Sequence, residues 1–319
     1  MSKYQRPGSA PTAGTQLGLV VAGFGRHVLV ETPEGKRIIC HPRGKKGQAL
    51  VGDNVRWLPS EDEGTIEKIV ERRNVFYRQD ELRTKSFAAN LDQILILIAA
   101  EPEFSESQLT RALIAAEAAG IAPIIALNKS DLTEPFGRAW AKLAPYRAMG
   151  YQMLPLAIKP KTDAPENAAQ TNELMALLKD KKTLVLGPSG SGKSSLTNLL
   201  IPAAKVLTAE ISQALNSGKH TTTSTTLYWV DAGRNTALID SPGFQEFGLH
   251  HIEPMQLAQL MPDFKAHAQS CKFYNCTHLH EPGCGVISEL KSGAGPINIS
   301  ANRYRLYSEL FAELSQTRY

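Results

Sequence analysis

The sequence predicts a multidomain α/β protein, with a small β-barrel first, a parallel sheet covered by helices in the centre and a metal-binding segment last. Three observations predict this order. Short β-type runs fill the first part of the chain, long apolar runs alternate with helical patterns in the middle, and three cysteines gather near the end. With 319 residues, 42% of them hydrophobic, the chain exceeds one typical core and suits two or three domains.

The N-terminal region begins with a polar stretch and continues with short strands. Residues 1–16 are rich in Ser, Pro, Gly and Thr, a composition typical of a flexible tail. Five β-type runs separated by turns follow, at residues 19–21, 27–30, 37–40, 53–57 and 64–70. So many strands in so short a stretch suit a Greek-key barrel of the OB-fold type, a fold that often binds oligonucleotides.

Basic side chains gather in the same region, and the whole chain carries a net charge of +4. They are Lys36, Arg37, Arg43, Lys45, Lys46, Arg72 and Arg73. One interpretation is a surface that faces RNA, and the other is an ordinary solvated basic rim. The net charge permits an anionic partner without demonstrating one.

The pattern changes in the middle of the chain. The stretch 76–90 is polar and suggests a linker, whereas the run at 95–99 is continuously apolar, as in a parallel strand covered on both faces. Ser105 and Gln108 then suit a capping box before a helical pattern that ends near Gly120. Because apolar strands and helical patterns continue to alternate, we expect an α/β domain with a parallel sheet.

A glycine-rich loop follows the apolar strand at 184–186 and precedes a helical pattern. The loop comprises Gly187, Pro188, Ser189, Gly190, Ser191, Gly192, Lys193, Ser194 and Ser195. This is the phosphate-binding pattern G-x-x-x-x-G-K-[ST] in its strand–loop–helix context, which argues against an ordinary Gly/Ser turn. Glycines let backbone N–H groups surround phosphate oxygens, Lys193 would reach the terminal phosphates, and the Ser194 hydroxyl would hold Mg²⁺.

A base-recognition motif lies upstream, at the end of the strand at 122–127. It consists of Asn128, Lys129, Ser130 and Asp131. The Asp131 carboxylate can accept the ring N–H and the exocyclic amine of guanine, whereas adenine presents a lone pair there. Asn128 would brace the loop, and the Lys129 stem would lie on the base. Four residues alone favour a turn, but with the phosphate loop they predict GTP or GDP as ligand.

Two further segments suit the phosphate end of a nucleotide. Asp240 and Gly243 form a D-x-x-G pattern after an apolar strand; Asp240 would steady Mg²⁺ and the Gly243 N–H would sense the γ-phosphate, although a plain strand-end turn uses the same residues. A threonine between them and the phosphate loop would bind Mg²⁺ only when the γ-phosphate is present. The sequence leaves Thr221, Thr222 and Thr223 open, and Thr223 is taken as the catalytic candidate.

The hydrolytic residue is the least determined part of this site. The position after D-x-x-G, where a glutamine would orient water, holds Phe244, and Gln245 comes one residue later. His220 is the better candidate, with a merely packed histidine as the alternative. We therefore name His220, Lys193 and Thr223 as catalytic candidates. The base motif also precedes the phosphate loop, and a circularly permuted sheet can still bring both to one edge.

The C-terminal region contains a candidate metal site. Cys271, Cys276, His278 and Cys284 make a complete Cys₃His set for one structural Zn²⁺, with His280 as a rival ligand and unliganded thiols as the alternative. No apolar stretch approaches the ~20 residues of a membrane span, and the N-terminus lacks an apolar signal. We therefore expect a cytoplasmic protein without a membrane partner, where clustered cysteines indicate metal.

Taken together, these motifs resemble one family, the circularly permuted GTPases of bacterial ribosome small-subunit maturation of the RsgA (YjeQ) type. The resemblance covers nearly the whole chain and rests on the order N-K-x-D, phosphate loop, H-T-T-T, D-S-P-G and C-x₄-C-x-H-x₅-C. It implies an N-terminal OB-fold β-barrel, a central circularly permuted P-loop GTPase sheet and a C-terminal zinc-binding helical domain. Phe244 matches the hydrophobic residue of the family, and the family's Ser-Ala guanine loop is echoed at Leu156–Ala157.

The resemblance also implies a function. It implies GTP hydrolysis stimulated by the small ribosomal subunit during late maturation, binding to that subunit and its rRNA, and release after hydrolysis. A monomer is the expected state. An RNA-binding assembly factor that uses nucleotide as a structural ligand is the alternative, and a nucleotide kinase is disfavoured by the base motif. The expected segments are a tail at 1–16, an RNA-binding barrel at 17–80, a linker at 81–90, the GTPase domain at 91–250 and the zinc-binding domain at 251–319.

Overall fold

The fold described below is that of a computed structural model, in which the first described residue is Gly14. The structure describes residues 14–24, 26–43, 47–61, 63–80, 84–160, 165–204, 225–243, 247–293 and 297–316. Within these ranges, no helix combines the length and the apolar composition needed to cross a membrane.

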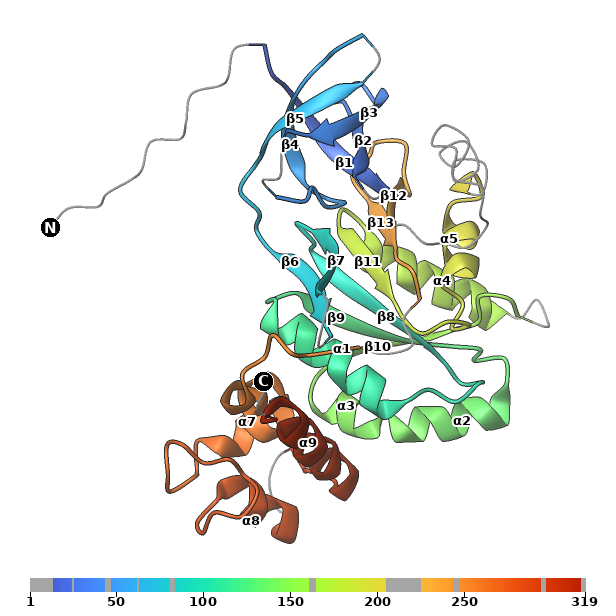
Figure 1. The fold of residues 1–319 in the computed structure, drawn as a ribbon. Helices are drawn as coiled ribbons and strands as arrows, with labels where there is room; N and C mark the ends of the chain where they lie inside the picture. Colours follow the sequence, from blue (N-terminus) through green and yellow to red (C-terminus); the bar gives the residue numbers. More distant parts are fainter. Residues whose placement is uncertain are drawn as a thin grey trace, which may run out of the picture.

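The N-terminal strands form a closed five-stranded barrel, drawn in blue in Figure 1. They are β1 (Gln16–Phe24), β2 (His27–Glu31), β3 (Arg37–Pro42), β4 (Asn54–Leu58) and β5 (Gly64–Ile69). Their order is β1-β2-β3-β5-β4, and β4 pairs back onto β1 to close the barrel. Gly64 is required inside it, because a Cβ there would lie 2.6 Å from the Cys40 sulfur and from the Trp57 ring. The five expected strands and the OB-like barrel are confirmed.

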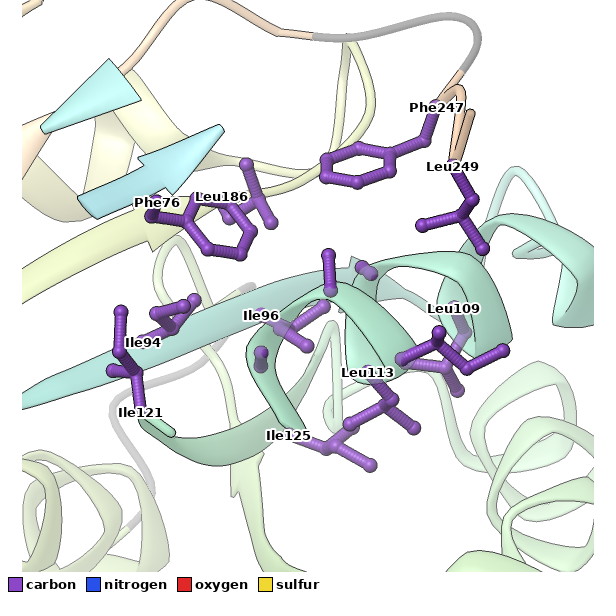
Figure 2. Close-up of a cluster of buried hydrophobic side chains, with 14 of the residues drawn as sticks. Phe76, Ile94, Ile96, Leu109, Leu113, Ile121, Ile125, Leu186, Phe247 and Leu249 are labelled. Carbon is purple, nitrogen blue, oxygen red and sulfur yellow. The ribbon is translucent and has the colours of Figure 1, made fainter. Parts of the chain in front are cut away.

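A β-hairpin occupies the stretch for which the sequence suggested a linker. β6 (Val75–Gln79) and β7 (Thr84–Ala89) pair with each other in a separate two-stranded sheet. Phe76 and Phe87 are buried with ring centroids 5.6 Å apart, and Phe247 lies 5.9 Å from Phe76. Figure 2 shows Phe76 and Phe247 above the strand and helix of the central core. The hairpin therefore packs as part of the core through Phe76, Phe87 and the two buried alanines that follow Phe87.

The central sheet is parallel apart from one edge strand. Its strands are β8 (Gln93–Ala99), β9 (Ala122–Asn128), β10 (Gln152–Leu156), β11 (Lys182–Leu186), β12 (Thr226–Trp229) and β13 (Ala237–Asp240). They run in the order β10-β9-β8-β11-β13-β12, with β12 antiparallel to β13. Every residue of β8 is buried, because helices cover both faces. The expected parallel α/β sheet is confirmed.

The covering helices separate into two layers (Figure 1). The first contains α1 (Glu106–Ala118), α2 (Thr133–Lys142) and α3 (Ala144–Ala148), and the second contains α4 (Pro165–Leu178) and α5 (Lys193–Leu200). Alternate β8 residues face the two layers, so that Ile96 packs with Leu113 of α1 while Leu97 shares the other core with Leu196 of α5. As the sequence predicts, Ser105 caps α1 by accepting a hydrogen bond from the Gln108 N–H. Gln108 Oε1 has no partner among the described residues, so only half of the expected capping box forms.

The barrel and the central sheet are hydrogen-bonded into one sheet of eleven strands. Ala22 of β1 pairs with Thr226 of β12. Beside this junction the buried Glu31 accepts hydrogen bonds from Trp229 Nε1 at 2.6 Å and from Arg37 Nε at 2.9 Å. The β1–β12 pairing and the hydrogen bonds of the buried Glu31 carboxylate thus hold the barrel against β12, the strand of the central sheet farthest from β10.

The C-terminal helices pack against α1, at the lower left of Figure 1. They are the 3₁₀ helix η1 (Pro254–Leu260), α7 (Pro262–Ala268), α8 (Gly285–Ser292) and α9 (Ala301–Leu314). Arg303 of α9 and Asp263 of α7 form a buried ion pair at 2.8 Å, and Arg303 also donates to Thr110 of α1 at 2.8 Å. The guanidinium therefore joins three helices.

We expect Arg303→Met to lower the free energy of unfolding by about 3–5 kcal/mol, because it leaves the Asp263 carboxylate buried and unpaired. Urea denaturation of the full chain measures this loss. Arg305→Gln on the same helix is the matched control, since its ion pair with Glu309 is exposed and should contribute less than about 1 kcal/mol. A loss below 1 kcal/mol for Arg303→Met would contradict the structural role of the buried pair.

Candidate functional site

The carboxyl ends of β8, β9, β11 and β13 converge at one edge of the sheet. Parallel pairing places Asn128 beside Ala99, Leu186 beside Ile96, and Asp240 beside Val185. The loops that leave these strands therefore meet, although they are far apart in the chain. The three predicted motifs, at 128–131, 187–195 and 240–243, all begin here.

The side chain of Asn128 connects three of the loops. Its Nδ2 donates to the Ser191 carbonyl at 3.0 Å, and its Oδ1 accepts from the backbone N–H groups of Lys129 at 2.8 Å and Ile158 at 3.1 Å. Asn128 is 5% exposed, so each of these bonds is shielded from water. The base motif and the phosphate loop are thus hydrogen-bonded neighbours. Ile158 was not singled out in the sequence, because a backbone contact leaves no side-chain signal.

Two glycines of the phosphate loop are required by this close approach. A Cβ on Gly192, whose φ is +108°, would lie 2.5 Å from Asn128 Nδ2. A Cβ on Gly187 would lie 2.2 Å from the Leu97 carbonyl oxygen. Both distances are far below van der Waals contact, so the loop keeps its path only with glycine at these positions.

Lys193 lies inside the loop rather than in solvent. Its Nζ donates to the carbonyls of Gly187 at 2.9 Å and Pro188 at 2.8 Å, and burial lowers the pKa of its ammonium group. Helix α5 begins at Lys193, with Ser194 and Ser195 in its first turn. The N-terminus of that helix and the ammonium group together provide positive potential at the loop, which suits a phosphate.

The acidic partner of Lys193 is Asp240, at the end of β13. Burial raises the pKa of the Asp240 carboxyl to about 6, and the nearby Lys193 opposes this shift. Among the described residues, Asp240 Oδ1 and the Ser191 hydroxyl are both buried without a hydrogen-bond partner. Such atoms are costly unless a ligand, an ion or water satisfies them, so the site fits a bound Mg²⁺–nucleotide. A Cβ on Gly243 would lie 3.1 Å from Lys193 Nζ, which places the D-x-x-G turn against the phosphate loop.

The base motif is held at its first three residues and open at its last. Ser130 N–H donates to the Leu156 carbonyl at 2.9 Å, its hydroxyl donates to Gln170 at 3.1 Å, and Lys129 Nζ donates to the Glu101 carbonyl. Asp131 is partly exposed and forms no hydrogen bond or ion pair within the ranges that the structure describes. Its carboxylate is therefore available to a ligand. The segment around Leu156 and Ala157, only weakly marked in the sequence, lies against this motif.

A cavity of about 380 Å³ adjoins the same loop on the side of α1. Its walls come from the end of β8, the start of α1 and residues 188–191. Gln108 Oε1 is buried at this cavity and, like the Ser191 hydroxyl, has no hydrogen-bond partner in the part of the chain that the structure describes. No sequence pattern indicates the cavity, because it forms between two elements. His220, Thr221, Thr222, Thr223, Phe244 and Gln245 lie outside the described residues.

The second cluster lies in the C-terminal region. The ligand atoms of Cys271, Cys276, His278 and Cys284 all lie within 4.8 Å of one another. His278 Nδ1 is 3.5 Å from the sulfurs of Cys271 and Cys284, and these two sulfurs are 3.9 Å apart. Sulfurs bound tetrahedrally to zinc lie roughly 3.8 Å apart, so the set fits that ion. The exposed His280 is not part of the cluster.

Hydrogen bonds around the cluster hold its loop in place. Tyr304 and Tyr307 of α9 donate to the carbonyls of His278 and Thr277, each at 2.9 Å. The Glu281 carboxylate accepts from the Thr277 N–H at 2.8 Å. Burial raises the pKa of the Cys276 thiol, so a thiolate at this position needs a cation. These supports resemble the outer shell of a structural zinc site.

The fold and the site define a class of protein. A parallel sheet carries a phosphate loop, a D-x-x-G turn and an N-K-x-D loop at one edge. The N-K-x-D loop precedes the other two in the chain. This arrangement is that of a circularly permuted P-loop GTPase. The family model for the RsgA GTPase matches residues 69–250. The chain belongs to the RsgA GTPase family.

Curated relatives and solved structures agree with this assignment. A protein of Variovorax paradoxus (strain S110), named small ribosomal subunit biogenesis GTPase RsgA, is 69% identical over 98% of this chain and 99% of its own. The protein of the same name from Paraburkholderia xenovorans (strain LB400) is 49% identical over 96% of both chains.

Two solved structures share the fold at 28% sequence identity. The crystal structure of YjeQ from Thermotoga maritima has a TM-score of 0.71, with 95% of this chain and 100% of that chain covered. The structure of YloQ, described as a circularly permuted GTPase, has a TM-score of 0.69, with 96% of this chain and 98% of that chain covered. The similarity therefore extends over the barrel, the sheet and the C-terminal helices.

The raised pKa of Asp240 predicts a pH dependence of Mg²⁺–GDP affinity. A carboxyl with a pKa near 6 becomes protonated as the pH falls, and only its ionised form attracts the cation. We expect affinity to fall up to about tenfold per pH unit below 6 beyond the decline in Asp240→Asn. Calorimetric titrations from pH 5 to 8 measure this, and the variant corrects for titration of GDP itself. Identical pH profiles for both proteins would contradict the expectation.

The Cys₃His cluster predicts one zinc ion per chain. We expect Cys284→Ala to reduce the zinc content of the purified protein from about one to well below one half, because three ligands remain. Elemental analysis measures the content. Cys40→Ala is the matched control, because Cys40 is buried in the barrel outside the cluster and its loss should leave the metal in place. Full zinc occupancy in Cys284→Ala would rule out this ligand set.

Proposed function

We propose that this GTPase acts in late maturation of the small ribosomal subunit, binding the subunit with GTP and leaving after hydrolysis. The observation that carries the nucleotide part is the Asn128 side chain, which ties the base motif to the phosphate loop. The ribosomal part is supported by relatives at 69% and 49% identity that are named small ribosomal subunit biogenesis GTPases. A cytoplasmic location and a monomeric chain belong to the same proposal.

The roles of the site residues follow from their positions. Asp131 would accept the two guanine donors, while Asn128, Lys129 and Ser130 keep its loop in place. Backbone N–H groups of 187–195 and the Lys193 ammonium would hold the phosphates. Ser194 and Asp240 would hold Mg²⁺, which supplies charge neutralisation during phosphoryl transfer. The Gly243 N–H, beside Lys193, would respond to the γ-phosphate.

The hydrolytic step remains assigned to His220, Thr223 and Lys193. Phosphoryl transfer needs an oriented water and compensation of charge on the departing oxygens. Lys193 supplies the charge from a buried position. The assignment of His220 to the water, and of Thr223 to Mg²⁺, rests on the sequence alone.

The domain limits and the zinc ion complete the proposal. We take 17–80 as the RNA-binding region that contains the barrel, 91–250 as the GTPase domain and 251–319 as the zinc-binding domain. The stretch 81–90, expected as a linker, includes β7 of the core hairpin. One Zn²⁺ on the Cys₃His cluster would fix the C-terminal loop. Because β1 of the barrel pairs with β12 of the nucleotide-binding sheet, a subunit bound at the barrel would contact the same rigid sheet that carries the site.

Phosphate release from GTP tests this function. We expect slow hydrolysis by the protein alone and a rate at least tenfold higher with purified small subunits, whereas large subunits and naked rRNA should have less effect. Equal rates under all conditions would favour an RNA-binding factor that keeps nucleotide as a structural ligand. Adding nucleoside monophosphates as acceptors tests for a nucleotide kinase, and no phosphorylated product is expected.

Base selection gives a second, more local test. Asp131→Asn replaces one acceptor with a donor that faces the donors of guanine, so we expect GDP affinity to fall at least 100-fold. Glu134→Gln is the matched control, since this side chain is exposed nearby on α2. Calorimetry with GDP and ADP measures both variants. Unchanged GDP affinity in Asp131→Asn, or equal affinity of the unaltered protein for GDP and ADP, would contradict the assignment.

A further inference from the structure

The loop between the first two cysteines of the metal cluster carries two exposed aromatic rings. Its four residues, Lys272, Phe273, Tyr274 and Asn275, form what we call the aromatic tip, and all four are exposed. Tyr274 is 102% exposed and Phe273 is 41% exposed. Tyr274 forms no ring contact or hydrogen bond within the described part of the chain. Its ring is therefore not needed to pack this fold.

The exposure of the tip is not the result of a loose chain end. The loop begins and ends at Cys271 and Cys276, whose sulfurs belong to the metal cluster. The Lys272 N–H donates to the Gly283 carbonyl at 3.0 Å, and Gly283 has a φ of +74°. A Cβ on Gly283 would approach Lys272 Cβ to 3.1 Å. The fold thus holds the two rings outward on a short, anchored turn.

The one charged side chain of the aromatic tip is a lysine. Lys272 Nζ lies 5.6 Å from the centroid of the Phe273 ring, within the range of a cation–π contact. The neighbouring acid, Glu281, is turned inward, since its carboxylate accepts hydrogen bonds from the N–H groups of Thr277 and Leu279. An anionic partner can therefore approach the rings beside a lysine without meeting an exposed carboxylate from that turn.

We propose that the aromatic tip binds unpaired RNA bases, with Phe273 and Tyr274 stacking on them and Lys272 beside the backbone phosphate. The inference rests on the proposed function, because it names the part of the chain that would contact single-stranded rRNA. Exposed rings on a positively charged surface suit stacking on any base, and short metal-held loops are a known means of presenting them to single strands. A duplex offers no free base faces, so the proposal predicts a preference for single strands.

Binding of a fluorescein-labelled 12-nucleotide single-stranded RNA to the zinc-loaded full chain tests the proposal. We expect Phe273→Ala/Tyr274→Ala to weaken binding at least fivefold at every salt concentration, because stacking does not involve ion release. Lys272→Ala should instead reduce the slope of log affinity against log salt by about 0.7, as expected for one phosphate contact. A blunt duplex of the same sequence should bind all these proteins alike.

Three further variants separate stacking from other effects. Tyr274→Trp keeps a ring and should bind within twofold of the unaltered chain, whereas Tyr274→Leu keeps bulk without a ring and should not. Met255→Ala removes another exposed apolar side chain, from η1, and should have no effect. Zinc content and thermal melting, measured on each variant, identify any that fails to fold, and the two Tyr274 single substitutions then carry the test.

Photocrosslinking locates the contact directly. A 5-bromouridine version of the same RNA should crosslink to the peptide that contains Tyr274. Unchanged affinity of the double variant together with crosslinks confined to other peptides would overturn the proposal. So would weakened binding of that variant to intact small subunits without weakened binding to RNA, which would indicate a protein partner. Hydrolysis by the unaltered chain with small subunits tests the proposed function separately, because it does not depend on this oligonucleotide.

Discussion

The structure depends on one buried amide. Asn128 donates to the Ser191 carbonyl of the phosphate loop and accepts from the N–H groups of Lys129 and Ile158. One side chain thereby fixes a loop from β9, a loop from β11 and the segment after β10. Because Asn128 is only 5% exposed, water does not readily replace any of its three partners, and the geometry of all three loops is set together. Gly192, which leaves space for this amide, is part of the same constraint.

The remaining architecture supports this edge of the sheet from two sides. The barrel joins through β1 and β12, beside the buried Glu31 carboxylate. The C-terminal helices join through the hydrogen bond from Arg303 of α9 to Thr110 of α1. The first turn of α1 borders the cavity beside the phosphate loop. The nucleotide-binding edge is therefore in contact, through rigid elements, with both regions proposed to meet RNA.

Much of this fold could be predicted because its signals are local. Ser105 stands directly before a helical pattern, which marks it as an N-cap. The continuous apolar run of β8 identifies a strand covered on both faces. The loop 187–195 is likewise encoded in consecutive residues. Pairings between distant segments leave no such signal, so the joining of β1 to β12, the hairpin with Phe76 and the Arg303–Asp263 pair emerge only in three dimensions. Ile158 was missed because it contributes a backbone N–H.

The base motif precedes the phosphate loop in the chain, the reverse of the usual order, and we infer that the two loops still form one binding site for a guanine nucleotide. A crystal structure of the protein with Mg²⁺ and a non-hydrolysable GTP analogue tests it most directly. We expect the edge of the guanine base to lie within hydrogen-bond distance of the Asp131 carboxylate. In the same molecule, the β- and γ-phosphates should contact Lys193 and the N-terminus of α5. A nucleotide whose phosphates occupy the loop while its base lies away from Asp131 would contradict it.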